Sequence, residues 1–131
     1  MDVHEVPDRQ SVHEVLELLK GQWTVAVLAS LALGERQFND LLADVNLIEE
    51  HIGWTSHPRP LTARVLTDTL RRLQGHQLVD RRSNGNQFSA VWYRLTHDGR
   101  SLLRALRPLA NWARQHRRNS ESTTGRASSE P

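Results

Sequence analysis

Hydrophobic residues recur at helical spacing in five stretches of this 131-residue chain, which are separated by glycines, prolines and polar turns. The spacing predicts helices over residues 11–20, 22–33, 35–45, 62–74 and 97–118. Ser11 is expected to cap the first helix, with Glu14 completing a capping box and Gly21 ending the helix. The second stretch is apolar almost throughout, so we expect that helix to be buried.

The stretch from Leu61 to Arg82 has two different faces when its first part is placed on a helix. Leu66, Leu70 and Leu73 fall on one face, and the other carries Arg64, Thr67, Asp68 and Arg71. Two segments of alternating polarity then flank the turn sequence SNGNQ, which predicts a basic β-hairpin. This arrangement is typical of a winged helix-turn-helix that inserts its second helix into a DNA groove. An ordinary surface helix with solvated charges is the alternative.

Charge is unevenly distributed along the chain. Residues 1–58 contain three Lys and Arg side chains and ten carboxylates, whereas residues 59–118 contain thirteen Arg and three carboxylates, giving balances of −7 and +10. The net charge of +2 therefore conceals a basic segment, and clustered Arg side chains bind phosphate and release its counterions. The alternative is that the two halves neutralise each other in the folded chain.

Several classes of protein are disfavoured by what the sequence lacks. It contains no run of about 18 apolar residues and no secretory signal, so we expect a cytoplasmic protein without membrane contact. It contains no cysteine, which excludes disulfides, thiolate metal sites and thiol redox sensing. His51 and His57 have no firm metal-ligand spacing, so no metal is expected. Without a nucleophile–base motif or a phosphate-cradling glycine loop, neither a cofactor nor enzymatic activity is expected.

An ordered series of motifs resembles one family of bacterial transcriptional regulators. The series comprises GQW at Gly21 to Trp23, ERQFNDL with Arg36, Phe38 and Leu41, LTARVLTDTLRRLQGHQLVDR from Leu61, VWYRLTHDG from Val91 to Gly99, and an apolar stripe that ends near Trp112. Over about residues 11–116 this pattern resembles the HxlR-type winged helix-turn-helix family. The resemblance implies a homodimer that presents two reading helices, residues 62–74 of each subunit, to a palindrome. The implied interface residues of the first and last helices are Val12, Leu16, Leu19, Leu102, Leu106, Leu109, Trp112 and Ala113.

The expected fold class is mainly α with a small β-hairpin wing (α+β), a winged helix-turn-helix that dimerises through its first and last helices. We expect a flexible arm at residues 1–10, a DNA-binding and dimerisation domain at 11–118, and a disordered tail at 119–131. Pro108 lacks a backbone donor and is expected to kink the last helix or split it near Leu106.

Two groups of residues are expected to contact double-stranded DNA. Arg64 is the first choice for a base contact, because Arg can hold guanine with two hydrogen bonds. Arg72 is offset from the reading face, which favours a phosphate or an intrachain partner, and Asp68 is expected to orient a neighbouring Arg. The reading-helix candidates are Thr62, Ala63, Arg64, Thr67, Asp68 and Arg71. The wing and backbone candidates are Arg36, Gln37, Arg81, Arg82, Asn84, Asn86 and Gln87, with pairing to acids as the alternative for Arg81 and Arg82.

Residues 46–60 form a longer connection than the turn usual between such helices. Trp54 lies within it, and either anchors this segment or lines a small-molecule effector pocket there. The expected function is a sequence-specific regulator that acts as a homodimer on a palindromic operator and responds to a small molecule, if at all, through residues 46–60 or the dimer cleft. The alternative is a ligand- or protein-binding winged-helix module with weak DNA binding.

Overall fold

A computed structural model describes the backbone of residues 8–51, 59–83 and 90–129, and the side chains of residues 8–48, 59–83 and 90–122. In these ranges the chain forms α1 (Arg9–Leu19), α2 (Thr24–Ala32), β1 (Arg36–Gln37), α3 (Phe38–His51), α4 (Ala63–Gly75), β2 (Val79–Arg82), β3 (Trp92–Leu95) and α5 (His97–Ser129). The predicted fold class, mainly α with a small antiparallel sheet, is therefore confirmed. Residues 1–7, Trp54, Asn84, Asn86 and Gln87 lie outside the described residues.

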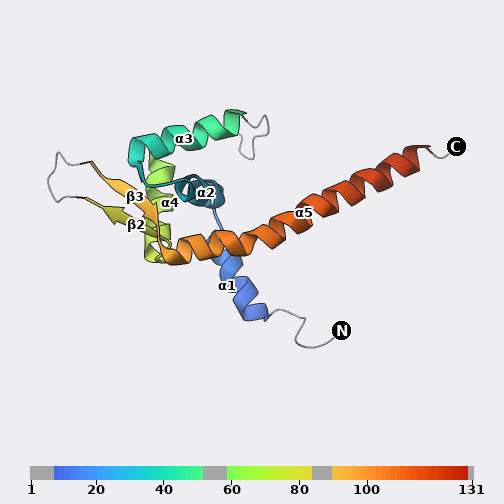
Figure 1. The fold of residues 1–131 in the computed structure, drawn as a ribbon, viewed down its shortest axis with the longest axis horizontal. Helices are drawn as coiled ribbons and strands as arrows, with labels where there is room; N and C mark the ends of the chain where they lie inside the picture. Colours follow the sequence, from blue (N-terminus) through green and yellow to red (C-terminus); the bar gives the residue numbers. More distant parts are fainter. Residues whose placement is uncertain (1–7, 52–58, 84–89, 130–131) are drawn as a thin grey trace.

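The sheet consists of the hairpin strands β2 and β3 together with the two-residue strand β1, in the order β1-β3-β2. Arg36 lies opposite Tyr93, and Arg82 lies opposite Trp92. Figure 1 shows this sheet on one side of the molecule and α5 extending away on the other. The sequence pattern placed residues 35–45 in one helix, because a strand as short as β1 is defined only by its pairing with β3.

The buried residues centre on α2, as its apolar sequence predicted. Val27, Leu28 and Leu31 are completely buried, and they form one core with Leu41 from α3 and with the apolar edge of α4. Tyr93 of β3 packs into the same core, and its ring lies 6.4 Å from that of Phe38. The core therefore joins both helices of the helix-turn-helix to the wing.

Helix α4 begins as predicted. The hydroxyl of Thr62 caps it by accepting a hydrogen bond from the backbone N–H of Val65 at 3.2 Å. Leu66, Leu70 and Leu73 are all at most 1% exposed, so the predicted apolar face is the buried one. The Arg-bearing face consequently points away from the core.

Helix α1 begins earlier than its sequence pattern indicated. Asp8 is the N-cap, and its carboxylate accepts hydrogen bonds from the backbone N–H of Gln10 and from the hydroxyl of Ser11. Ser11 therefore lies inside the helix and does not cap it, and the helix starts at Arg9, within the segment predicted as an arm. Asp and Ser are similarly good N-caps, so local preference alone could not choose between them.

Helix α3 is longer than predicted and shortens the connection assigned to residues 46–60. It continues to His51, because Leu47 and Ile48 extend the helical pattern. The Asn46 side chain then joins α3 to the chain just before α4. Its amide oxygen accepts from Leu61 N–H at 2.8 Å, and its amide nitrogen donates to Leu61 C=O at 3.1 Å. This pair of hydrogen bonds fixes where the chain enters the reading helix.

Helix α5 is longer than predicted, and it is not split at Pro108, which was one of the two effects expected of that residue. Thr96 caps it as expected, accepting from Gly99 N–H at 3.0 Å, but the helix runs unbroken past Pro108. Proline removes only one bond of the ladder, and flanking turns keep their own. Residues 119–129, predicted to be disordered, are helical as well. Extending an existing helix needs no new nucleation step. A polar segment whose composition predicts disorder can therefore continue a helix that is already formed.

Among the described residues, no single helix is both long and apolar enough to cross a membrane, and α1 and α2 meet that test only as a pair bent by 81°. The side chains described include no cluster of three or more His, Asp or Glu residues that could hold a metal ion. The side chains of His51 and His57 are outside that set.

Asn46→Ala should destabilise the fold, because it removes both partners of the Leu61 backbone and leaves a buried N–H unsatisfied. A loss of about 1–3 kcal/mol is expected in the free energy of unfolding, measured by urea denaturation. Asn39→Ala, at an exposed position on the same helix, is the control and should lose much less. Equal losses in the two variants would contradict this role for Asn46.

Candidate nucleic-acid interface

The outward face of α4 carries two arginines that the fold leaves available. Arg64 and Arg71 are exposed, and neither forms an ion pair with any described residue. Asp68, expected to orient one of them, is likewise exposed and unpaired within the described ranges. Thr67 donates its hydroxyl hydrogen to Ala63 C=O at 2.9 Å, which leaves its methyl group and oxygen lone pairs facing outward. This face can therefore donate several hydrogen bonds to an acidic partner.

A groove of about 530 Å³ separates α4 from the wing. Thr67 and Arg71 line it from α4, and Arg81 lines it from β2. Val91 and Tyr93 lie along the same groove. Candidates from the reading helix, Thr67 and Arg71, and from the wing, Arg81, thus line one concave surface. The guanidinium groups of the two elements can therefore approach the same ligand.

The second wing arginine has a partner within the chain. Both Nε and Nη2 of Arg82 donate to Oε1 of Glu35, at 3.1 and 3.0 Å, and this ion pair joins β2 to the turn before β1. On the neighbouring strand, Arg94 lies 3.5 Å from Asp80. Arg82 therefore pairs with a carboxylate of its own chain, which was the alternative to a phosphate contact.

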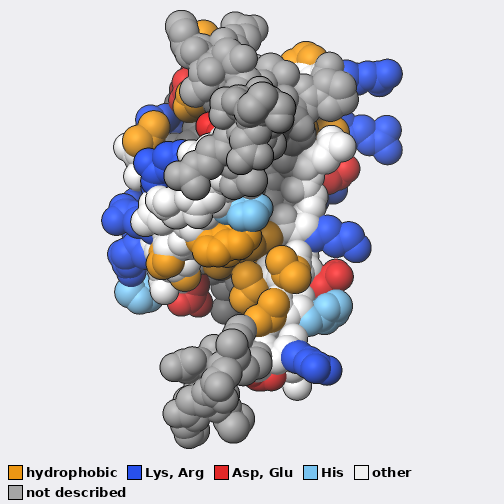
Figure 2. All heavy atoms as spheres, turned by 90° about the vertical axis from the view of Figure 1, so that its right-hand side faces the viewer, with side chains coloured by type: hydrophobic (Ala, Val, Ile, Leu, Met, Phe, Trp, Pro, Cys, Tyr) orange, Lys and Arg blue, Asp and Glu red, His pale blue; other side chains and the backbone are white. Residues whose placement is uncertain are grey.

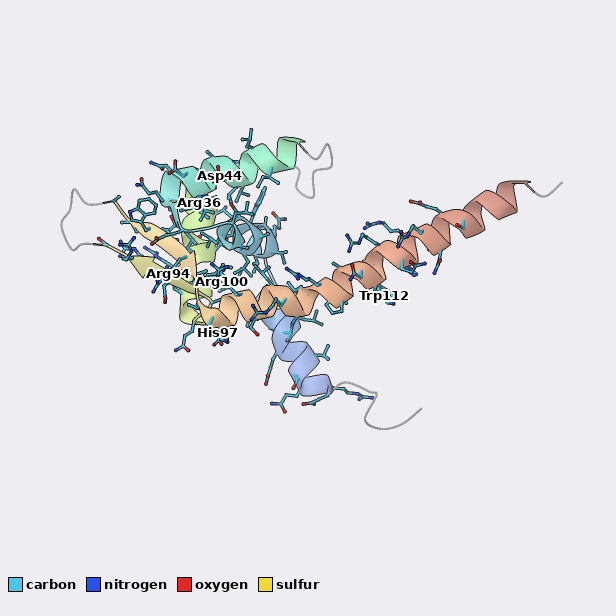
Figure 3. All side chains as sticks on the ribbon, in the orientation of Figure 1. Arg36, Asp44, Arg94, His97, Arg100 and Trp112 are labelled. Atoms are coloured by element: carbon cyan, nitrogen blue, oxygen red, sulfur yellow. The ribbon has the colours of Figure 1, made fainter. Side chains whose placement is uncertain are left out.

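Arg36, a predicted backbone contact, is also held within the fold. Its Nε donates to Oδ2 of Asp44 at 3.0 Å, and Nη1 donates to Glu35 C=O at the same distance. Figure 3 shows Arg36 and Asp44 together where α3 begins, far from Trp112 on α5. Gln37 is half-buried in β1 opposite Trp92. Arg36 is thus held by its own chain, so its cationic group is less available than those of Arg64 and Arg71.

Arg72 has an intrachain partner, one of the two roles expected for it. Its guanidinium donates to Leu18 C=O at 3.0 Å and to the hydroxyl of Thr24. It therefore faces the junction of α1 and α2, and Arg64 and Arg71 face outward.

Large hydrophobic side chains on α1 and α5 are exposed in the single chain. Leu16 is 61% exposed, Leu109 58% and Trp112 62%, and the Trp112 ring stacks on that of His116 with centroids 5.0 Å apart. A group of hydrophobic side chains is visible on the face shown in Figure 2. The other predicted interface residues are exposed at Val12 and half-buried at Leu19, Leu102, Leu106 and Ala113.

The basic half of the sequence is divided between two surfaces. One comprises α4 and the wing. The other is the length of α5, where Arg100, Arg104, Arg107 and Arg114 are exposed along one helical face, on the side away from Leu109 and Trp112. Composition counted all of these charges together, but among the described arginines only Arg71 and Arg81 line the groove.

These elements are those of a winged helix-turn-helix, and the family model described as HxlR-like helix-turn-helix matches residues 18–121. The chain belongs to the HxlR-like helix-turn-helix family. A Mycobacterium tuberculosis protein named as an uncharacterised HTH-type transcriptional regulator is 30% identical over 107 residues, covering 82% of this chain and 59% of the relative. Another such regulator, from Methanothermobacter thermautotrophicus, is 26% identical and is covered over 79% of its length. The chain thus spans less than two thirds of the mycobacterial relative.

Solved structures of regulators have the same fold. A protein assigned to the MarR family of transcriptional regulators, from Enterococcus faecalis V583, superposes with a TM-score of 0.71 at 24% identity, covering 93% of this chain and 99% of that one. The reduced form of the regulator YodB from B. subtilis gives 0.63 at 20% identity, covering 83% and 94%. The reduced redox regulator HypR gives 0.62 at 24% identity, covering 86% and 98%. At these identities the likeness shows the fold alone.

Glu35→Gln should release Arg82 from its ion pair and strengthen binding of the HxlR-like domain to random duplex DNA. We expect the slope of log K against log salt concentration to steepen by up to about 0.9, the increment for one added phosphate contact. The pair is solvent-exposed, so the free energy of unfolding should fall by less than about 1 kcal/mol. Glu17→Gln, which breaks the exposed pair with Lys20 on α1, removes the same charge and is the control. An identical slope change in both variants would contradict the release of Arg82.

Proposed function

We propose that this chain is a sequence-specific, double-stranded-DNA-binding transcriptional regulator that acts as a homodimer on a palindromic operator in the cytoplasm. The observation that carries the proposal is the outward face of α4, where Arg64 and Arg71 have no acidic partner among the described residues. If α4 were an ordinary surface helix with solvated charges, its arginines could pair with acidic residues of the same helix. Here Asp68 is exposed on the helix without doing so, and the groove lined by Thr67 and Arg71 is lined by Arg81 of the wing as well.

The roles of the individual residues follow from their positions. Arg64 lies in the first turn of α4 and is the proposed base contact, with Ala63 and Thr62 close to the DNA at the helix start. Arg71 and Arg81 both line the groove, from α4 and from β2, and are the proposed contacts of one backbone phosphate. Asn84, Asn86 and Gln87 are proposed wing contacts on the basis of the sequence. Arg36 and Arg82 would contact DNA only after their ion pairs with Asp44 and Glu35 break.

Dimerisation is proposed through the apolar faces of α1 and α5. Burying their exposed Leu and Trp side chains stabilises association by about 25 cal/mol per Å² of apolar surface. A second copy of the chain carries the same two faces, so the two copies can pair with two-fold symmetry. A symmetric dimer would present two α4 helices to two half-sites of one palindrome.

Regulation is proposed without thiol chemistry and without enzymatic activity. The sequence contains no cysteine, so no thiol of this chain can act as a redox sensor. We assign any small-molecule response to residues 46–60, including Trp54, or to the dimer cleft. No metal or organic cofactor is included in the proposal.

The central test is binding of Arg64→Ala to a duplex carrying the promoter of the protein's own gene and to a scrambled duplex. The variant should lose about 1–3 kcal/mol on the promoter and little on the scrambled sequence, because a lost base contact affects only the cognate site. Arg104→Ala, on α5, removes the same charge and should change neither affinity appreciably. Equal affinity of the wild-type protein for both duplexes would exclude sequence-specific regulation and favour a winged-helix module with weak DNA binding.

Leu106→Asp should convert the dimer to a monomer, because it places an unpaired charge in the proposed apolar interface. Sedimentation velocity measures the outcome, and circular dichroism checks that the helices remain. Asn111→Asp adds the same charge on the outer face of α5 and should stay dimeric. A dimer in both variants would place the interface elsewhere.

A further inference from the structure

Helix α1 is attached to the rest of the fold mainly at its C-terminal end. None of its residues is buried, and Leu18 is the residue of α1 that packs against the core, at the edge next to the turn. The direction of α1 relative to the reading helix therefore depends on contacts around the segment from Leu18 to Thr24.

Arg72 of α4 provides those contacts. It donates one hydrogen bond to Leu18 C=O, one of the carbonyls that the end of α1 leaves without a helical partner, and another to the Thr24 hydroxyl. Thr24 is fully buried, and its hydroxyl in turn donates to Lys20 C=O at 3.0 Å. A guanidinium at this position also opposes the negative end of the α1 dipole. The C-terminus of α1 is thus capped by a residue 54 positions away in the sequence.

Gly21 leaves the space in which the Arg72 side chain lies. Its φ is +115°, and a Cβ added there would lie 2.6 Å from Nη2 of Arg72 and 2.9 Å from the Thr24 hydroxyl. Two open cavities, of about 780 and 350 Å³, each have Gly21 and Arg72 in their linings. The Arg72 side chain thus borders both cavities, and a glycine at position 21 leaves room for it.

We propose that Arg72 is a positioning residue that sets the spacing between the two reading helices of the dimer, and hence the operator half-site spacing that the protein prefers. This inference rests on the proposed function. Helix α1 belongs to the proposed interface, α4 reads DNA, and the angle between them decides how far apart two symmetry-related α4 helices lie. In a dimeric helix-turn-helix protein that distance must match the separation of the half-sites.

The experiment measures affinity for a set of palindromes whose half-site separation varies by single base pairs around the wild-type optimum. Arg72→Gln should flatten the profile: affinity at the optimum falls by up to about tenfold, because α1 must then be fixed relative to α4 at the expense of binding energy and one charged hydrogen bond limits that amount, and affinity at neighbouring spacings falls less. Arg72→Lys keeps the charge and can still reach one acceptor, so it should restore part of the preference. Arg71→Gln, the matched control on the reading face, should lower affinity at every spacing by the same factor.

Thr24→Val provides a second route to the same result, since it keeps the side-chain shape and removes only the hydroxyl, and it should flatten the profile less than Arg72→Gln. Thermal unfolding and sedimentation establish that each variant is folded and dimeric. A profile of unchanged shape in both Arg72→Gln and Thr24→Val, shifted only to weaker binding, would overturn the inference and leave the proposed function standing. Wild-type protein with no preference for palindromes would overturn the proposed function itself.

Discussion

The burial of Leu66, Leu70 and Leu73 against α2 and the sheet is the constraint on which the rest of this structure depends. Replacing one such leucine by alanine costs about 2–5 kcal/mol, so the rotation of α4 about its own axis is strongly determined. Once that edge is buried, Arg64 must face outward, and Arg71 and Arg72 lie on opposite sides of it, Arg71 at the groove beside the wing and Arg72 at the junction of α1 and α2. The same burial therefore decides which arginines can meet a ligand and which cannot.

The position of α4 along and across the fold depends on polar contacts at its two ends. Near its start, Asn46 joins α3 to the backbone of Leu61, and Thr62 caps the first turn. Near its end, Arg72 reaches the junction of α1 and α2. Apolar burial sets the rotation of the helix, and these hydrogen bonds, which are directional, set its tilt and register.

Ion pairs alter the apparent charge of the surface formed by α4 and the wing. Arg36 and Arg82 are paired with Asp44 and Glu35, and as partly exposed pairs they add little to stability. Their main effect is to reduce the number of guanidinium groups that are available to bind a phosphate. The basic balance of residues 59–118 is therefore a poor measure of the positive charge beside α4.

The sequence predicted most of the elements, since amphipathic periodicity and the caps at Thr62 and Thr96 are local signals. It did not predict β1, the partners of Arg36, or the Asn46–Leu61 contact, because each depends on residues that meet only in the folded chain. The start of α1 was predicted at a Ser11 cap and was wrong, because Asp8 is an equally good cap and holds the helix from Arg9, and the extent of α5 depends on propagation from a helix already formed. For Arg72 the helical offset indicated a different role, but its partners at Leu18 and Thr24 lie about 50 residues away and leave no local signal.

Because the chain has no cysteine, a single introduced cysteine can carry a photoactivated cross-linker to one defined place. The most direct test of the account is cross-linking to the promoter duplex from Ala63→Cys, at the start of α4, compared with Gln115→Cys on α5. Efficient cross-links from residue 63 that map to bases within each half-site are expected, with few from residue 115. Cross-links from residue 115 with none from residue 63 would contradict it.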